Sequence, residues 1–262
     1  LISFSGIIFW GVVLIIPASI RANIVTITTS LVIGLYMIEV FLTYFQVQDP
    51  LVRARIVEAK RLGIDYDRRT KFEMIEDLIE QGLDAVPSMG PKLLLASSDK
   101  ILPLGGISNR TTVATNENGY YMVYLSDRYG FNNPDSEWDS KQVEWLLTGD
   151  SFTEGLAVRP GEDIAGQIRA ITNQSSINLG RAGNGPLMEL AELIEYAEAI
   201  KPRKVIWVYY EENDLRGDIQ RDKSKPFLMR YMEEGFSQDL VNRQTYIDDH
   251  LGAALVEFQE QS

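Results

Sequence analysis

The stretch LLTGDSFTEG, residues 146–155, is where the sequence changes character most sharply. An apolar run stops at Gly149 and gives way to polar residues that begin with Asp150 and Ser151. This pattern is typical of a buried strand that ends at the edge of a sheet and is followed directly by a helix. Ser151 is then either a nucleophile presented at the strand end or only the cap of the helix that follows.

Apolar runs and amphipathic segments also alternate on the C-terminal side of this stretch. We expect strands at 143–148, 175–179 and 204–210, and helices near 160–170, at 185–200 and from about 222 onward. Strands that are separated by helix-length crossovers form a parallel sheet with helices on its faces. The C-terminal half therefore predicts an α/β fold with a parallel sheet.

The N-terminal part of the chain is apolar. Residues 1–17 carry no charge, and residues 24–45 form a second apolar run after a linker that holds Arg21. Each run approaches the ~20 residues that cross the hydrocarbon of a bilayer, whereas soluble helices normally show a polar face. We therefore predict a transmembrane helical hairpin over residues 1–45, with the lipid bilayer as its partner. The alternative is a buried helical hairpin in a soluble core.

Residues 46–110 join the hairpin to the α/β part. This segment predicts a juxtamembrane helical region and then an extended connection rich in Pro, Ser and Gly, with helices at 50–62 and 70–82 and the connection at 84–110. Residues 111–262 form the α/β domain. It opens with a β-hairpin whose turn contains Asn118-Gly119, because this pair accepts the positive φ of a tight turn.

Composition excludes several classes of function. The 37 Asp and Glu residues exceed the 25 Lys and Arg residues and give a formal charge of −12, which repels phosphate backbones. We therefore expect no nucleic acid among the partners. The chain has no cysteine and a single histidine, so the usual ligands of zinc are missing. We expect neither a metal nor another cofactor.

A short polar motif follows each of the three strands. Singly, each motif has a structural explanation: Ser151 is a helix cap, Gly183 a flexible loop residue, and Asn213 part of a turn. In open α/β sheets, however, sites gather at the carboxyl ends of the strands. There the Ser151 and Gly183 N–H groups and the Asn213 amide would converge on a tetrahedral oxyanion, and Gly183 has no Cβ to keep a substrate away. The pattern predicts an acyl-transfer site.

These motifs resemble the first three conserved blocks of the SGNH/GDSL hydrolases. The matching stretches, in chain order, are GDSFTEG at 149–155, NLGRAGNG at 178–185 and Asn213-Asp214. The resemblance covers roughly residues 141–262. It implies a flavodoxin-like three-layer α/β/α arrangement around the parallel sheet, and hydrolysis or transfer of an ester-linked acyl group.

The resemblance also implies roles for individual residues. Ser151 matches the nucleophile, and Gly183 and Asn213 match the residues of the oxyanion hole. Further residues of the same blocks are expected to support the site: Asp150, Asn184 and Asp214. Membrane-tethered members are similar to enzymes that handle O-acetyl groups on surface polysaccharides. An acylated glycan is therefore the substrate that the resemblance implies.

Two departures from the family pattern stand out. The third block usually has a glycine where this chain has Glu211. The family also takes its general base from an Asp-x-x-His motif near the C-terminus, whereas the only histidine here, His250, has Ile247 three residues before it. We expect His250 to be a surface residue of a helix. Either the base lies beyond residue 262, or the protein is a non-catalytic relative.

Three hypotheses follow. The first is a membrane-anchored SGNH-type esterase or acyltransferase. The second is an accessory or scaffold subunit that binds other proteins in a membrane complex. The third is a protein that binds glycans without turnover.

The sequence contains conflicting signals about the side of the membrane on which the large domain lies. Cations follow the second apolar run closely, and the positive-inside rule would place the large domain in the cytosol: Arg53, Arg55, Lys60 and Arg61. Long domains translocate largely regardless of charge. Because the resemblance favours the other side, we expect an integral membrane protein with an extracytoplasmic, periplasmic domain.

Overall fold

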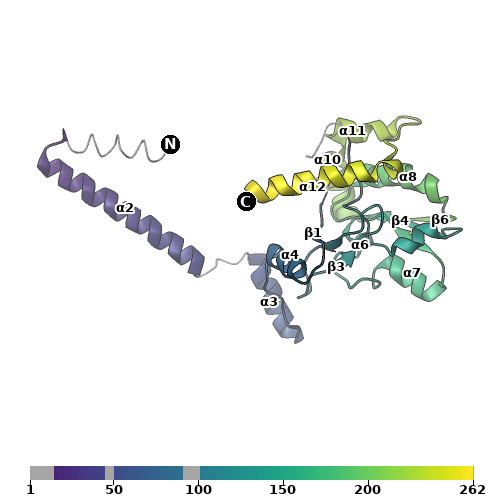
Figure 1. The fold of residues 1–262 in the computed structure, drawn as a ribbon, viewed down its shortest axis with the longest axis horizontal. Coiled ribbons are helices and arrows are strands. Elements are labelled where there is room, and N and C mark those ends of the chain that lie inside the picture. The colour runs from purple at the N-terminus through teal and green to yellow at the C-terminus, as the bar shows by residue number, and fades with distance from the viewer. Residues whose placement is uncertain (1–14, 45–49, 91–100, 262) are drawn as a thin grey trace. The chain divides into compact units, whose positions relative to one another are not determined.

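The computed structural model describes residues 15–44, 50–90 and 101–261 (Figure 1). The chain divides into two compact units, Leu1–Val57 and Glu58–Ser262.

The first unit is dominated by one long helix, α2 (Ala18–Tyr44). Its stretch Ile20–Phe41 has 22 residues and a mean hydropathy of 1.9, which makes it long and apolar enough to cross a membrane. Apolar side chains such as Leu31 and Ile33 are exposed along this helix. The first arm of the predicted hairpin, residues 1–14, lies outside the described residues. Helix α3 (Pro50–Leu62) comes next and extends across the division between the units.

The second unit begins with the end of α3 and helix α4 (Lys71–Glu80). The predicted capping box is confirmed, because the Thr70 hydroxyl accepts the Glu73 N–H at 3.2 Å and the Glu73 carboxylate accepts the Thr70 N–H at 2.6 Å. The amphipathic pattern of α4 buries Ile75 and Leu78 in a small core with Val113.

A small three-stranded sheet follows, in the order β1-β2-β3. Strands β2 (Thr111–Val113) and β3 (Val123–Leu125) are antiparallel, which confirms the predicted hairpin. In its turn Gly119 has φ +97° and donates its N–H to the Asn116 side chain at 3.0 Å. Strand β1 (Ala85–Pro87) pairs in parallel with β2 and lies in the segment that was predicted as a connection.

A second sheet carries the three strands expected from the sequence: β4 (Trp145–Gly149), β5 (Ser176–Asn178) and β6 (Lys204–Val208). Their order is β5-β4-β6, and both pairings are parallel. Helix α7 (Ile164–Thr172) packs on β5, and helix α8 (Pro186–Ile200) packs on β4. The predicted α/β fold with a parallel sheet is therefore confirmed.

The long helix α12 (Gln244–Gln261) and several short helices complete the described part of the unit: η1 (Asp135–Asp139), α6 (Ser151–Glu154), α9 (Glu211–Asn213), η2 (Asp214–Asp218), α10 (Ile219–Lys223), α11 (Pro226–Met229), η3 (Arg230–Met232) and η4 (Leu240–Asn242). The main core joins segments that are distant in sequence. It contains Leu146 and Ile177 of the parallel sheet, Leu104 of the segment before β2, and Leu251 of α12. The compact unit thus includes residues N-terminal to 111, where the sequence placed the start of the α/β domain.

Candidate active site

The position of Ser151 follows from the end of β4. A Cβ on Gly149 would overlap the Thr153 hydroxyl and lie 2.7 Å from the Val208 carbonyl oxygen, so only glycine lets α6 and β6 approach this strand end. Asp150 caps α6, because its Oδ1 accepts the Phe152 N–H at 3.0 Å. The structure therefore assigns the cap to Asp150. The half-buried Ser151 is the first residue of the helix.

A side-chain hydrogen bond joins the segment that follows β6 to the segment that follows β4. The Asn213 Nδ2 group donates to Asp150 Oδ2 at 3.2 Å. One oxygen of the Asp150 carboxylate thus accepts a hydrogen bond from the helix that begins with Ser151, and the other accepts one from the third motif. Asn213 Oδ1 is buried and has no hydrogen-bond partner among the described residues.

The end of β5 is tied to the same place. Arg181 donates its N–H to the Gly149 carbonyl at 3.2 Å, and Asn178 Nδ2 donates to the Thr153 carbonyl at 2.5 Å. Asn178 Oδ1 accepts the Gly180 N–H at 2.8 Å. The loops after β4 and β5 are therefore joined by hydrogen bonds.

Gly183 follows in the β5 loop with φ +82°, in the left-handed region that favours glycine. Two further predicted residues lie inside the protein. Asn184 is buried, and its Nδ2 donates to Glu192 Oε1 at 2.6 Å. Asp214 is buried, and its Oδ2 accepts the Tyr210 N–H at 2.7 Å. Both side chains are therefore held by hydrogen bonds to the surrounding scaffold.

Glu154 is a residue that the sequence reasoning passed over. Its carboxylate is buried and accepts the Ala182 N–H at 2.6 Å, one residue before Gly183. The Tyr124 hydroxyl donates to the same carboxylate at 3.4 Å. Burial raises the pKa of Glu154, and the charges of Arg181 and Lys71 oppose that rise. The sequence signal for Glu154 was its position inside the GDSFTEG stretch, in which neither the motif analysis nor the family resemblance assigned it a role.

A group of buried acids lies behind the strand ends. Glu189 on α8 accepts the Trp207 Nε1–H at 2.7 Å. Burial raises the pKa of Glu189 to about 7, and the charges of Asp214 and Asp150 add to the rise. Burial also raises the pKa of Asp214. This cluster could not be predicted from the sequence, because burial of an acid depends on which helix face meets the sheet.

His250 lies on α12, where its ring stacks on Tyr246 with centroids 6.3 Å apart. It is half-buried, and its Nε2 atom is buried without a hydrogen-bond partner. The expectation of a surface position is therefore corrected, because α12 buries Ile247 and Leu251 on either side of this residue. Within the described parts of the chain, neither His250 nor any other base is hydrogen-bonded to the Ser151 hydroxyl.

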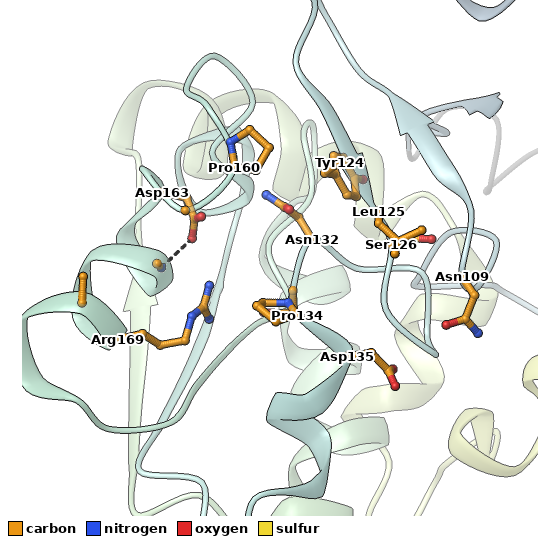
Figure 2. Close-up of a pocket in the computed structure, with 14 residues that line it drawn as sticks. Asn109, Tyr124, Leu125, Ser126, Asn132, Pro134, Asp135, Pro160, Asp163 and Arg169 are labelled. Atoms are coloured by element: carbon orange, nitrogen blue, oxygen red, sulfur yellow. Dashed lines mark hydrogen bonds between the residues drawn. The ribbon is translucent and has the colours of Figure 1, made fainter. Parts of the chain in front are cut away.

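The same parts of the chain hold no cluster of three or more His, Asp or Glu side chains arranged to bind a metal ion. A cavity of about 710 Å³ lies elsewhere, between β3, the loop after it and the start of α7 (Figure 2). Figure 2 shows the Arg169 side chain reaching from α7 toward Pro134, and Asp163 bonded to the N–H of Gly166 at 3.0 Å. None of the predicted site residues lines this cavity.

Comparison with known proteins found no matching family model, no matching curated protein and no matching solved structure.

Proposed function

We propose that the protein is a membrane-anchored serine hydrolase or acyltransferase of the SGNH type that acts on an O-acyl ester through Ser151. The observation that carries this proposal is the hydrogen bond from Asn213 to Asp150. It brings the amide of the third motif to the residue that precedes the nucleophile. The parallel order β5-β4-β6 supports a flavodoxin-like three-layer arrangement as part of the same proposal.

The chemistry would proceed in two acyl transfers. The Ser151 oxygen attacks the ester carbonyl carbon while a base takes its proton, and the carbonyl oxygen becomes an oxyanion. The backbone N–H groups of Ser151 and Gly183 and the Asn213 amide stabilise that charge. The intermediate then expels the alcohol, which takes the proton back from the base, and leaves an acyl-enzyme. Water or an acceptor alcohol gives its proton to the base and attacks this second ester, and the base then returns the proton to the serine oxygen as it leaves.

Asn213 is suited to this task by its bond to Asp150. A carboxamide nitrogen carries two hydrogens. One of them is held by Asp150 Oδ2, and this fixes the plane of the amide. The second hydrogen then serves the oxyanion, so the donor is oriented before the substrate arrives.

His250 does not supply the general base that the proposal requires. His250 is stacked on Tyr246 in α12, and Ile247 occupies the place of the motif aspartate. The family motif Asp-x-x-His does not occur in these 262 residues. The proposal therefore requires a base other than His250.

Membrane attachment completes the proposal. Helix α2 is assigned as a span because its apolar stretch matches the thickness of a bilayer. The globular unit is placed on the extracytoplasmic side, with an acylated surface glycan as its substrate.

The test is active-site labelling of the complete protein with a fluorophosphonate probe, together with hydrolysis of a nitrophenyl ester. We expect covalent labelling that Ser151→Ala abolishes. The control Ser136→Ala removes an exposed hydroxyl from η1 and keeps the labelling. Asn213→Ala should lower kcat by about 100- to 1,000-fold, as removal of an oxyanion donor does. Absence of labelling in the complete protein, or labelling that persists in Ser151→Ala, would overturn the proposal.

A scaffold subunit is the second candidate, and the exposed sheet edge favours it. Strand β6 is an edge of the described sheet, and its Val205 and Trp207 side chains are 50% and 55% exposed. Unpaired edges of this kind accept strands from other proteins. A stoichiometric partner that is lost in Val205→Lys but retained in Ser151→Ala would support this function over hydrolysis.

A further inference from the structure

Helix α3 has a charge balance opposite to that of the whole chain. It carries four cations and one acid, a net charge of +3, whereas the chain as a whole carries −12: Arg53, Arg55, Lys60 and Arg61 against Glu58. Arg61 and Glu58 are paired at 2.6 Å, and both side chains are more than half exposed. An exposed pair of this kind is worth little because water screens it. An anionic partner therefore competes readily for Arg61.

Three of the four cations of α3 lie on its outer face, whereas Arg55 is half-buried on the opposite side. At 3.6 residues per turn, Arg53, Val57, Lys60 and Arg61 share one side of the helix. Val57 lies at the centre of this side and is 64% exposed. The opposite side contains the buried Ala59. The outer face thus combines cations with an exposed apolar side chain, a combination found on helices that lie on a charged membrane surface.

The covalent chain keeps this face close to the proposed membrane span. The apolar stretch of α2 has 22 residues, about 33 Å of helix, which is close to the hydrocarbon thickness of a bilayer. Five residues separate Tyr44 at the end of α2 from Pro50 at the start of α3. A connection of that length spans at most about 21 Å. With α2 in the bilayer, α3 begins within reach of the lipid headgroups.

We propose that the outer face of α3 binds the anionic headgroups of membrane lipids. The guanidinium groups of Arg53 and Arg61 and the ammonium group of Lys60 would pair with lipid phosphates. Each cation near an anionic surface raises affinity about fivefold, so three raise it roughly 100-fold. This inference uses no residue of the candidate active site. It rests on the membrane anchoring of α2 within the proposed function, and not on the chemistry of Ser151.

Because these 262 residues contain no cysteine, a single introduced thiol can be labelled specifically. Within these 262 residues, Val57→Cys would introduce the only thiol, and an environment-sensitive fluorophore attached there reports the surroundings of the outer face. The labelled protein is placed in nanodiscs of phosphatidylcholine alone, or with about 30% phosphatidylglycerol, and quenched with acrylamide, which is uncharged. We expect quenching to fall by roughly half when phosphatidylglycerol is present, and 0.5 M NaCl to reverse this protection because salt screens surface charges.

Charge reversal separates lipid binding from a general effect of charge. In the labelled background, Arg53→Glu, Lys60→Glu and Arg61→Glu together should abolish the protection by phosphatidylglycerol. A control with the same change in net charge reverses exposed lysines of the globular unit and should keep it: Lys141→Glu, Lys201→Glu and Lys223→Glu. Equal quenching in both kinds of disc, or protection that survives reversal on α3, would overturn the inference.

The result is independent of enzyme activity. A protein that fails to hydrolyse esters but shows the lipid-dependent protection refutes the hydrolase proposal alone. A protein that separates from the discs during gel filtration refutes both the anchoring of α2 and the binding by α3. An active protein whose label is equally quenched in both discs refutes only the lipid inference.

Discussion

Replacing Glu189 by glutamine should make the protein more stable at neutral and alkaline pH. Glu189 is buried on α8, and its pKa is raised from the ordinary 4.5 to about 7, first by burial and then by the neighbouring acids Asp214 and Asp150. A raised pKa means that the folded state binds the proton more tightly than the unfolded state. The stability that this proton contributes is fully present below pH 4.5 and is lost as the pH rises through 7.

The expected effect follows from the size of this pKa rise. At about 1.4 kcal/mol per pKa unit, a rise from 4.5 to about 7 corresponds to about 3 kcal/mol. Glutamine resembles the protonated acid and still accepts the Trp207 Nε1–H, so the variant and the wild type should match near pH 4.5. By pH 8 the free energy of unfolding of Glu189→Gln should exceed that of the wild type by about 3 kcal/mol.

The assay is denaturant unfolding of the full chain in detergent from pH 4.5 to 8, followed by tryptophan fluorescence. Glu198→Gln is the matched control, because Glu198 lies on the same helix and is exposed. This control should leave the pH dependence unchanged. Asp214→Asn should reduce the difference between Glu189→Gln and its parent, since one source of the raised pKa is gone. Stability curves of Glu189→Gln and wild type that run parallel across this pH range would refute the reasoning.

Three further substitutions probe the frame of the site. Glu154→Ala leaves the half-buried Ala182 N–H without its acceptor and should lower the free energy of unfolding by about 1–2 kcal/mol, whereas Glu154→Gln should restore most of it, as measured by urea unfolding. Gly149→Ala should cost about 1–3 kcal/mol in the same assay because its methyl group meets the Val208 carbonyl at 2.7 Å. Thr70→Ala removes the cap of α4 and should lower the melting temperature through a loss of about 1 kcal/mol, checked by circular dichroism.

The parallel sheet could be predicted because its strands have a recognisable pattern in the sequence. In β4 the run Trp145–Leu147 is apolar, because the central strand is covered on both faces, and it ends abruptly at Gly149-Asp150-Ser151. The same topology predicted that the ends of β4 and β6 would meet, and the bond between Asp150 and Asn213 joins them.

The parts that sequence reasoning did not find depend on distant contacts. Strand β1 has only three residues and contains Pro87, so it shows no periodicity. Leu102 lies in a Pro- and Gly-rich segment but is buried, and its backbone is held by Gln238, which lies 136 residues later. Glu154 and Glu189 are acids in short amphipathic stretches. Nothing local distinguishes a solvated acid from one that tertiary packing buries.

The two oxygens of Asp150 give the loop after β6 and the start of α6 a common point of attachment. When thermal motion displaces one of these segments, the shared carboxylate moves the other with it. The displacements of the Ser151 hydroxyl and the Asn213 carboxamide are therefore correlated, so the distance between these two groups changes little. Asp150→Ala would let the two segments fluctuate independently, and the spread of their separations would widen even where the average positions stayed the same.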